Sequence, residues 1–581
     1  METRQTLGLF EKRALIVLLM MTFCSANVIV LCNVFVLYSP PHRCYVSGID
    51  GSNISGTAVA ELPPTPTNSS SGNELYIFIQ TKKSNNDDAT IWWDQCHRYN
   101  FDEIQDNATS AANVNLTIGG CDEGWKYYAN NGEISAVMEF DLVCNDAWQA
   151  PLAPSFVMFG FMAGSMIGSF LSDRYGRRFA LILTWVVLSL SMLLLAVTPF
   201  WSISYVLWFL VGCCSITRAT TSMVIVNELT PEKYRRLTSS VMMAVCSFGY
   251  VATPLMAYVL PNWRHQLILL GGAQLSLLLP CICYVKESLH WLIQNKKYEA
   301  ATILLQEISR INKKEYEEPQ LLLATQATEL NENQVKESKN KKQTSYIDFV
   351  KYSFLRRRVL IFSMAWFSTT VSYYGLSLNT NNLGGNRYLT CFIAGAVDFP
   401  GDLLCFFLIK KIGGRLSFVT MAGVCSVCLL MTPILSSAKW VAVTISMIGK
   451  LFIAGAFANN YLFTGDLFPT LHRSQSYGAC SFISRIGGIL VPFMLQLGQS
   501  VHESIPYFVC GTVTLFATMA MYFLPETKSM PLPDTMEDAK LQDRNSARVL
   551  CYRNSGKKQE NKETEIDSAN DELTTQETKE V

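Results

Sequence analysis

Five ionisable residues stand inside long apolar stretches of the sequence: Arg218, Asp398, Asp402, Lys450 and Arg485. A charge inside a helix that crosses a bilayer is costly, so such a residue is a candidate for function. A guanidinium holds a carboxylate or sulfonate through two parallel hydrogen bonds and keeps its charge. Arg485 is therefore a candidate for contact with an anionic substrate or a coupling anion. The alternative is an arginine that pairs with a structural carboxylate.

The other charges leave several roles open. Asp402 pairs with Arg485 or Arg218, contacts the cationic end of a zwitterion, or titrates as a proton site. Arg218 adds positive charge to the same cavity, or it forms a buried ion pair that touches no ligand. The sequence alone does not choose among these roles.

Other kinds of chemistry find no support in the sequence. The chain has no Gly-x-x-x-x-Gly-Lys-Ser/Thr phosphate loop, and its Cys and His spacings do not suggest a metal site. Nothing points to a hydrolytic triad. The 47 basic residues balance the 47 acidic ones, so no bulk charge favours a nucleic acid. We expect no cofactor, no metal, no nucleic-acid partner and no enzymatic activity.

The segments that carry these charges are long enough to cross a bilayer. The chain is 49% hydrophobic and only 16% charged, which places it in the membrane class. A spanning helix needs about 20 apolar residues, and the sequence offers twelve such segments. The predicted spans are 14–37, 150–171, 179–198, 202–226, 237–260, 265–285, 358–379, 387–409, 416–437, 440–464, 475–498 and 505–524.

A polar loop over 38–149 separates the first two spans and contains all the N-x-Ser/Thr sequons. Four sequons in one loop predict a glycosylated segment outside the cell. An even number of cysteines on that oxidising side suggests two disulfides, with three connectivities open. The sequons are at Asn53, Asn68, Asn107 and Asn115, and the cysteines are Cys44, Cys96, Cys121 and Cys144.

The loops on the other side collect basic residues, which predicts that they are cytoplasmic. Both termini, 1–13 and 526–581, then lie in the cytoplasm, and the polar tail is expected to be disordered. The segment 286–357 is also cytoplasmic. Within it, Ala301, Leu304, Leu305 and Ile308 recur at helical spacing, which predicts a short helix over 298–311.

The two halves of the chain repeat each other. Glu228-Leu-x-Pro-x-x-x-Arg235 recurs as Asp466-Leu-x-Pro-x-x-x-Arg473 at an offset of 238 residues, which also matches Gly176 with Gly414. Two six-helix bundles (150–285 with the first span, and 358–525) are the architecture of carriers that bind substrate between their halves. The repeated charges predict gates that open as the halves rock, and a static ion pair is the alternative. The gating candidates are Asp173, Arg174, Arg177, Arg178, Glu228, Arg235, Arg415, Asp466 and Arg473.

The second span contributes a further pattern. Gly160, Gly164 and Gly168 recur at four-residue spacing, which predicts a face that a neighbouring helix approaches closely. Together with the basic turn 172–178 (Ser-Asp-Arg-Tyr-Gly-Arg-Arg), this segment resembles the connection between helices 2 and 3 of the major facilitator superfamily.

Nearly the whole chain resembles the organic cation/carnitine/organic anion transporter family, solute carrier family 22. The resemblance is carried by 35–44 (Phe-Val-Leu-Tyr-Ser-Pro-Pro-His-Arg-Cys), 139–144 (Glu-Phe-Asp-Leu-Val-Cys), 373–386, 462–470 and 525–527. It implies an aromatic cavity wall, for which plain packing is the alternative. The residues implied are Phe248, Trp366, Tyr373, Tyr374, Phe457 and Tyr461.

The resemblance also bears on the charges. Arg485 groups the chain with the anion and carnitine branches, because the cation branch carries Asp at that position. Lys450 is shared with the same branches and is a candidate gate or substrate contact. Asp402 stands where anion carriers have Lys, and Lys286 replaces the family's usual Pro.

We therefore expect an alternating-access carrier of small organic ions, secondary active or facilitative, in the plasma membrane. Anions or zwitterions anchored by Arg485 are the expected substrates, and the lipid bilayer is the other partner. The alternative is an organic cation carrier with Asp398 or Asp402 as counter-ion. A third reading, a non-transporting sensor that uses the glycosylated loop, is disfavoured by the paired gating motifs.

Overall fold

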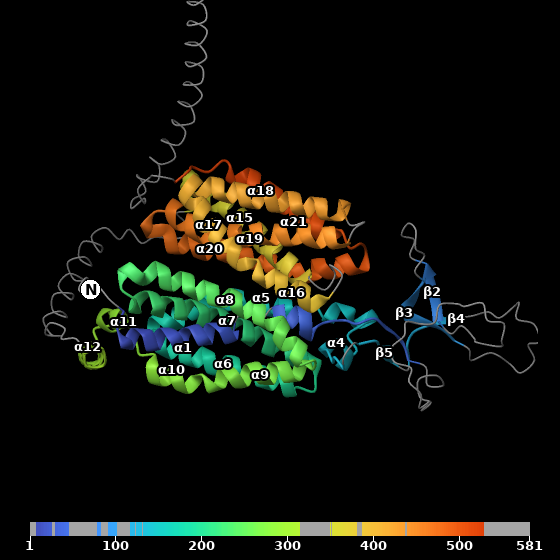
Figure 1. Ribbon diagram of the computed structural model, residues 1–581, viewed down its shortest axis with the longest axis horizontal. Coiled ribbons are helices and arrows are strands. Elements are labelled where there is room, and N and C mark those ends of the chain that lie inside the picture. The colour runs from blue at the N-terminus through green and yellow to red at the C-terminus, as the bar shows by residue number, and fades with distance from the viewer. Residues whose placement is uncertain are drawn as a thin grey trace, which may run out of the picture. The chain divides into compact units, whose positions relative to one another are not determined.

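A computed structural model of the chain describes residues 7–25, 30–45, 78–82, 91–100, 117–122, 124–129, 132–313, 349, 351–379, 386–435 and 439–527 (Figure 1). The chain divides into two compact units. The C-terminal unit consists of Met1–Glu11, Asn227–Phe248 and Glu287–Val581, and the N-terminal unit of Lys12–Val226 and Gly249–Lys286. The four predicted glycosylation sites lie outside the described residues.

Helices make up most of both units. The N-terminal unit contains η1 (Leu31–Val36), α4 (Ala136–Glu139), η2 (Cys144–Gln149), α5 (Leu152–Tyr175), α6 (Arg177–Val197), α9 (Trp263–Ser276) and α10 (Leu278–Tyr284). The C-terminal unit contains α11 (Leu289–Gln294), α12 (Tyr298–Asn312), α15 (Ser353–Leu378), α16 (Arg387–Ala396), α17 (Asp398–Ile412), α18 (Gly414–Ile434), α19 (Lys439–Leu467), α20 (Thr470–Ser500) and α21 (Ile505–Met521). Three helices have residues in both units: α1 (Leu9–Ser25), α7 (Trp201–Leu229) and α8 (Glu232–Val259).

The described helices match the predicted spans. Among the described residues, ten helical segments are long and apolar enough to cross a membrane, and α21 is a shorter apolar helix. The predicted first span, 14–37, is covered by α1 and η1, with 26–29 outside the described residues. Within the C-terminal unit, α15 packs against α19, α20 and α21, and α18 packs against α19 and α21 (Figure 1). The prediction of an all-α membrane fold is confirmed.

Two predicted spans are interrupted rather than continuous. The span 265–285 breaks between α9 and α10 at Leu277, and the span 387–409 breaks between α16 and α17 at Val397. Each break lies just before a proline, Pro280 or Pro400. Proline lacks the amide proton that would bond the carbonyl four residues earlier, and its ring clashes with that carbonyl. Those carbonyls belong to Ser276 and Ala396, where α9 and α16 end.

The glycine face of α5 packs against α7. A Cβ added at Gly160 or Gly164 would overlap the backbone of α7, and one at Gly168 would overlap the Thr217 side chain. Thr217 also donates from its hydroxyl to the Gly164 carbonyl at 2.8 Å. The predicted close approach is confirmed, with α7 as the partner. In the C-terminal unit Gly401 of α17 and Gly455 of α19 make the same kind of contact.

The turns after α5 and α17 correct one residue of the predicted repeat. Gly176 ends α5 with φ of 111°, and Gly413 ends α17 with φ of 92°. Gly413 therefore corresponds to Gly176, because only these two glycines adopt the left-handed backbone at the two turns. The predicted match of Gly176 with Gly414 is wrong by one residue, so Arg178 corresponds to Arg415.

The short helix predicted over 298–311 is present as α12. Its predicted apolar positions, Ala301, Leu304, Leu305 and Ile308, are all buried. They form a small core with Phe10 and with α11 residues, including Trp291 and Leu292. Ser288 caps α11 by accepting a hydrogen bond from the Trp291 amide. The amphipathic pattern therefore predicted both the helix and the face that it buries.

Five short strands lie in the segment after η1. β1 (His42–Cys44) pairs with β5 (Trp125–Tyr127), and β2 (Phe78–Lys82), β3 (Ile91–Asn100) and β4 (Thr117–Gly119) form an antiparallel sheet. Both pairings lie within the N-terminal unit. The four cysteines of this segment form two disulfides, Cys44–Cys121 and Cys96–Cys144, which select one of the three connectivities left open by the sequence.

Candidate functional site

The break between α16 and α17 places a carboxylate inside the C-terminal unit. Asp398 is the first residue of α17, where unpaired amides and the helix dipole favour a negative charge. Its side chain is buried. The proline two residues later causes the break, so the local sequence Asp398-Phe-Pro400 determines where this carboxylate lies.

A lysine from α19 pairs with this carboxylate. Lys450 is 1% exposed, and its Nζ lies 3.4 Å from Asp398 Oδ1. The Tyr373 hydroxyl of α15 donates to Asp398 Oδ2 at 2.8 Å. Lys450 also donates to the Ser377 hydroxyl, and its ammonium lies 3.3 Å from the centre of the Tyr373 ring. Three helices thus hold one ion pair by charge, hydrogen bonds and cation–π attraction.

Five of the six predicted aromatic residues come together next to this ion pair. We call Trp366, Tyr373, Tyr374, Phe457 and Tyr461 the aromatic cluster. Tyr373 stacks on Phe457 at 5.3 Å between ring centroids, and Trp366 meets Tyr461 edge-on at 4.6 Å. Tyr374 lies edge-on to Tyr373 at 5.3 Å. Positions 366 and 373 of α15, and positions 457 and 461 of α19, follow helical spacing, so each pair lies on one face of its helix.

Arg485 of α20 lies at the edge of the aromatic cluster. Arg485 is 6% exposed. The guanidinium lies within hydrogen-bonding range of the Tyr374 hydroxyl, and its charge also acts on Tyr461. Of the predicted binding residues in the C-terminal unit, the structure therefore brings Arg485, Lys450 and the aromatic cluster together.

The remaining predicted binding residues have other surroundings. Asp402 lies one helical turn after Asp398, where the charges of Asp398 and Lys450 both act on it. Phe248 packs against Phe399 with ring centroids 6.2 Å apart, and it keeps 58% exposure. In the N-terminal unit Arg218 is 3% exposed and lies over the Trp185 ring at 5.7 Å.

The sequence analysis missed several polar and aromatic neighbours of the cluster. The Tyr477 hydroxyl donates to the Tyr461 carbonyl, and Trp366 donates to the Thr464 hydroxyl at 3.2 Å. Asn460 donates from its amide nitrogen to the Thr369 hydroxyl at 2.8 Å. A signal for Tyr477 was available, because it lies two helical turns before Arg485 on the same face of α20.

Five of the gating candidates, Asp173, Arg174, Arg177, Arg178 and Arg415, make contacts within their own units. Asp173 and Arg177 form an ion pair at 3.2 Å along α5 and α6, and Arg178 donates to the Ile282 carbonyl at 2.8 Å. Arg415 donates to the Leu524 carbonyl at 2.8 Å and lies 3.7 Å from Glu526. The side chains of Arg235 and Arg473 lie outside the described residues, so the repeated motif is seen only through Glu228 and Asp466. Arg174 lies over the Phe170 ring at 5.6 Å.

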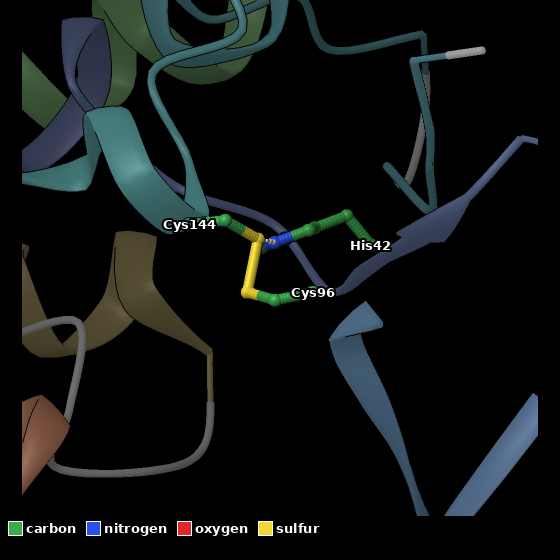
Figure 2. Close-up of side chains that lie close together, drawn as sticks. All are labelled: His42, Cys96 and Cys144. Carbon is green, nitrogen blue, oxygen red and sulfur yellow. Dashed lines mark hydrogen bonds between the residues drawn. A yellow bond between two sulfur atoms is a disulfide. The ribbon is translucent and has the colours of Figure 1, made fainter. Parts of the chain in front are cut away.

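His42 lies beside one disulfide of the segment after η1 (Figure 2). Its Nε2 is 3.9 Å from Cys144 Sγ, and the donor atoms of His42, Cys96 and Cys144 lie within 4.8 Å of one another. Cysteine binds a metal as a thiolate, and the sulfurs of Cys96 and Cys144 form a disulfide, so these residues do not form a metal site in this state. Burial lowers the pKa of His42 even though a hydrogen bond with the Pro40 carbonyl acts in the other direction, which favours a neutral imidazole.

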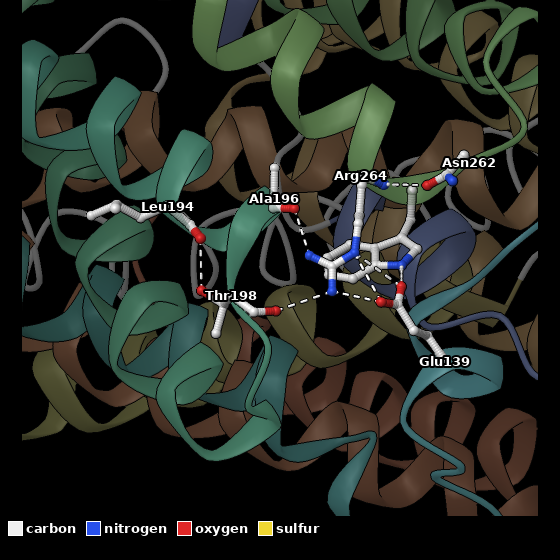
Figure 3. A network of polar contacts seen from close by, with 7 residues as sticks. Glu139, Leu194, Ala196, Thr198, Asn262 and Arg264 are labelled. Atoms are coloured by element: carbon white, nitrogen blue, oxygen red, sulfur yellow. Dashed lines mark hydrogen bonds and ion pairs between the residues drawn. The ribbon is translucent and has the colours of Figure 1, made fainter.

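A second polar network joins α4 to the helix ends of the N-terminal unit (Figure 3). The Arg264 guanidinium donates to Glu139 and to the carbonyls of Ala196 and Thr198. Trp263 Nε1 also donates to Glu139, at 2.8 Å. Burial alone would raise the pKa of Glu139, but the hydrogen bonds from Arg264 and Trp263 and the arginine's charge together hold it below its usual range. The network ties together 139, 196–198 and 263–264, which are far apart in sequence.

Comparison with known proteins decides the family. The family model described as "Sugar (and other) transporter" matches residues 112–538. "Solute carrier family 22 member 3" of Mus musculus is 30% identical over 457 residues, covering 76% of this chain and 79% of that protein. The chain belongs to solute carrier family 22.

Other relatives of this family match as widely. "Organic cation/carnitine transporter 2" of Homo sapiens is 28% identical over 525 residues, covering 87% of each chain. "Solute carrier family 22 member 6" of Mus musculus is 30% identical and covers 83% of this chain and 86% of that protein. Among solved structures, the inward open xylose transporter XylE from E. coli aligns with a TM-score of 0.54 at 16% identity, covering 68% of this chain and 89% of that one. The fold is therefore that of the major facilitator superfamily.

Membership of solute carrier family 22 settles the broad function. The chain is a multi-pass membrane transporter of small organic substrates and not an enzyme. The names of the relatives include both a cation/carnitine transporter and members without a stated charge preference. The charge of the substrate must therefore be argued from the residues of this chain.

Proposed function

We propose that this solute carrier moves small organic anions or zwitterions across the plasma membrane by alternating access. One observation carries the proposal: Arg485 is 6% exposed and lies at the edge of the aromatic cluster, against Tyr374 and Tyr461. Arg485 would bind the negative group of the substrate, and the rings would enclose its body.

The chemistry of the two parts fits such a substrate. A buried guanidinium interacts with a carboxylate or sulfonate more strongly than in water, because little solvent screens the charges. Planar rings offer stacking contacts worth about 0.5–1.5 kcal/mol each for an aromatic body. Trp366 and Phe457, whose centroids are 6.4 Å apart, supply two such rings next to the arginine's tyrosine partners.

The charge pattern supports an anion over a cation. A cationic substrate needs a carboxylate, and Asp398 already forms an ion pair with Lys450 at 3.4 Å. A cation would have to displace a buried lysine, which would leave that ammonium without its partner and cost about 3–5 kcal/mol. A cation carrier that uses Asp398 is therefore disfavoured by this pairing, and a cation carrier that uses Asp402 is the competing proposal.

We also propose an orientation for the chain, a set of gates and two further substrate contacts. Glycans at Asn53, Asn68, Asn107 and Asn115 would put residues 38–149 outside the cell, with both termini in the cytoplasm. Asp173, Arg177, Glu228, Arg415 and Asp466 would serve as gates that exchange partners during the cycle, and Arg218 and Phe248 would contact substrate. A mobility shift after removal of N-glycans, lost on mutation of the four asparagines, tests the orientation.

Uptake into expressing cells tests the substrate assignment. We expect wild-type cells to take up a labelled aromatic carboxylate. Uptake by the Arg485→Ala variant should be at least about tenfold lower, because a charge-assisted hydrogen bond contributes about 1.5–3 kcal/mol. Ser481→Ala, one turn earlier on α20, is the matched control and should keep the wild-type rate at equal surface expression. Equal uptake by wild type and Arg485→Ala would overturn the role of Arg485. Inhibition by quaternary ammonium ions but not by carboxylates would favour the cation carrier.

A further inference from the structure

The charges inside the apolar parts of the C-terminal unit's described helices form a set that the substrate alone does not explain. Asp398 at the start of α17, Lys450 of α19 and Arg485 of α20 are buried, and Asp402 of α17 is half-buried. The negative group of the proposed substrate pairs only with Arg485. Lys450 pairs with Asp398 at 3.4 Å, so Asp402 is the carboxylate that has no role in either interaction.

Asp402 shares its surroundings with the ion pair. It lies four residues after Asp398, on the same face of α17, so the two carboxylates are one helical turn apart. The charges of Asp398 and Lys450 both act on it. One lysine is therefore shared between two carboxylates, and like charges this close repel each other where little water screens them.

The groups that face these charges from the packed helices do not supply a second cation. From α15 they are the phenols of Tyr373 and Tyr374, from α16 the Cys391 thiol, from α18 the Cys425 thiol, and from α17 itself the Cys405 thiol. Thiols and phenols carry no charge near neutral pH. The charged residues of α16 and α18, Arg387 and Arg415, stand in the first turns of those helices, away from their middle.

The formal charges of the set give a rule for coupling. With Asp402 ionised and no substrate, the four side chains sum to zero. An organic monoanion on Arg485 makes the set negative by one charge, and a proton on Asp402 alone makes it positive by one. Substrate and proton together restore zero. A set with net charge is costly to keep away from water, so only the empty and the doubly loaded states are favoured.

We propose that Asp402 binds one proton in each cycle and that the carrier moves its organic anion together with that proton. The carboxylate accepts the proton from hydronium and releases it to water on the other side, so one proton and one monoanion cross together without net charge. This inference rests on the proposed anion transport and adds its coupling ion.

The test uses an aromatic sulfonate, which stays ionised across the range studied, so that its own protonation cannot mimic coupling. Expressing cells, with the membrane potential clamped at zero, are placed at about pH 5.5 outside and about pH 7.5 inside. Since one pH unit is a tenfold change in proton concentration, electroneutral coupling predicts accumulation of up to about 100-fold. A pH-sensitive dye should report acidification of the cytoplasm when the sulfonate is added.

Variants assign the coupling to Asp402. In Asp402→Asn the accumulation should fall to about onefold and the acidification should vanish, while exchange of labelled for unlabelled sulfonate at equal pH continues. Phe406→Leu, four residues later on the same helix at an exposed position, is the matched control and should keep both signals. Asp402→Glu, which restores a carboxylate, should keep them too.

The outcomes separate this inference from the proposed function. Sulfonate uptake by wild type that is independent of the pH gradient overturns proton coupling but leaves anion transport standing. Retention of proton-driven accumulation in Asp402→Asn, at normal surface expression, overturns the role of Asp402. If no sulfonate enters wild-type cells under any gradient, the anion assignment itself fails and the coupling with it. The wild-type measurement does not depend on any variant, so it can refute proton coupling even if a variant folds poorly.

Discussion

Lys450 and Asp398 form an ion pair in the interior of a helix bundle, with Nζ 3.4 Å from Oδ1 and almost no exposure of either side chain. Lys450 comes from the middle of α19, whereas Asp398 begins α17 at a break that Pro400 causes. The pair is held on three sides by the Tyr373 hydroxyl and ring and by the Ser377 hydroxyl. A buried pair of this kind constrains what either residue can do in transport.

Removing one partner of this pair should cost more than removing both. Lys450→Ala leaves Asp398 buried without its cation, which should destabilise the protein by about 3–5 kcal/mol. The double variant Lys450→Ala/Asp398→Ala removes both charges and should recover much of that loss. The melting temperature of the purified protein in detergent, compared across the two single variants and the double variant, measures the difference. Single and double variants that lose the same stability would contradict a mutual pairing.

The stacked rings of the aromatic cluster should select for aromatic substrates. Phe457 stacks on Tyr373 at 5.3 Å, so Phe457→Leu should weaken the affinity for an aromatic anion by roughly 2- to 10-fold, the worth of one ring contact. Affinity for an aliphatic anion should change little. The ratio of inhibition constants for an aromatic and an aliphatic carboxylate measures this preference.

A control for this effect lies on the same helix. Phe463 of α19 packs against Phe362 with centroids 5.2 Å apart and belongs to a separate ring contact. Phe463→Leu should therefore leave the ratio of the two inhibition constants at its wild-type value. If both leucine variants shift the ratio equally, the aromatic cluster has no special part in selectivity.

The glycine contact between α5 and α7 should not tolerate a methyl group. A Cβ at Gly164 would overlap backbone atoms of Cys213, so Gly164→Ala must push the helices apart or fail to fold. Gly272 of α9 has no atom within 4 Å of an added Cβ, so Gly272→Ala is the matched control. It should be neutral or gain up to about 1 kcal/mol from helix propensity. The yield of monodisperse protein and its melting temperature distinguish the two variants.

The Glu139 network should make stability depend on pH. The pKa of Glu139 is lower in the folded protein than its ordinary value, so the network stabilises the fold above the unfolded pKa of about 4.3 and loses this effect as the pH falls through the folded value. Melting temperatures of wild type and Glu139→Gln should therefore differ near neutral pH and converge at an acidic pH below the lowered pKa of folded Glu139.

A second glutamate controls for the loss of one carboxylate. Glu299 is exposed on α12, so Glu299→Gln should have the same melting temperature as wild type at both neutral and acidic pH. A difference in melting temperature between wild type and Glu139→Gln that stays constant across the pH range would mean that Glu139 acts through packing and not through its charge.

The sequence by itself determined the class of the molecule and most of its elements. Apolar runs of spanning length, the small-residue face of Gly160, Gly164 and Gly168, and the spacing of Ala301, Leu304, Leu305 and Ile308 are local patterns, and local patterns set where helices form and which face they bury. The intramembrane charges were visible for the same reason, since each stands out against its own apolar neighbours.

Only the tertiary structure decided which of these charges belong together. Asp398 and Lys450 are far apart in the chain, and pairing across helices depends on rotation and depth, which no local pattern specifies. Tertiary structure also decided three other features: the match of Gly413 with Gly176, the pairing of the disulfide cysteines and the contact of Trp366 with Tyr461. Contacts between distant segments depend on how the whole bundle packs, and a side chain's partner is therefore a property of the fold and not of its neighbours in sequence.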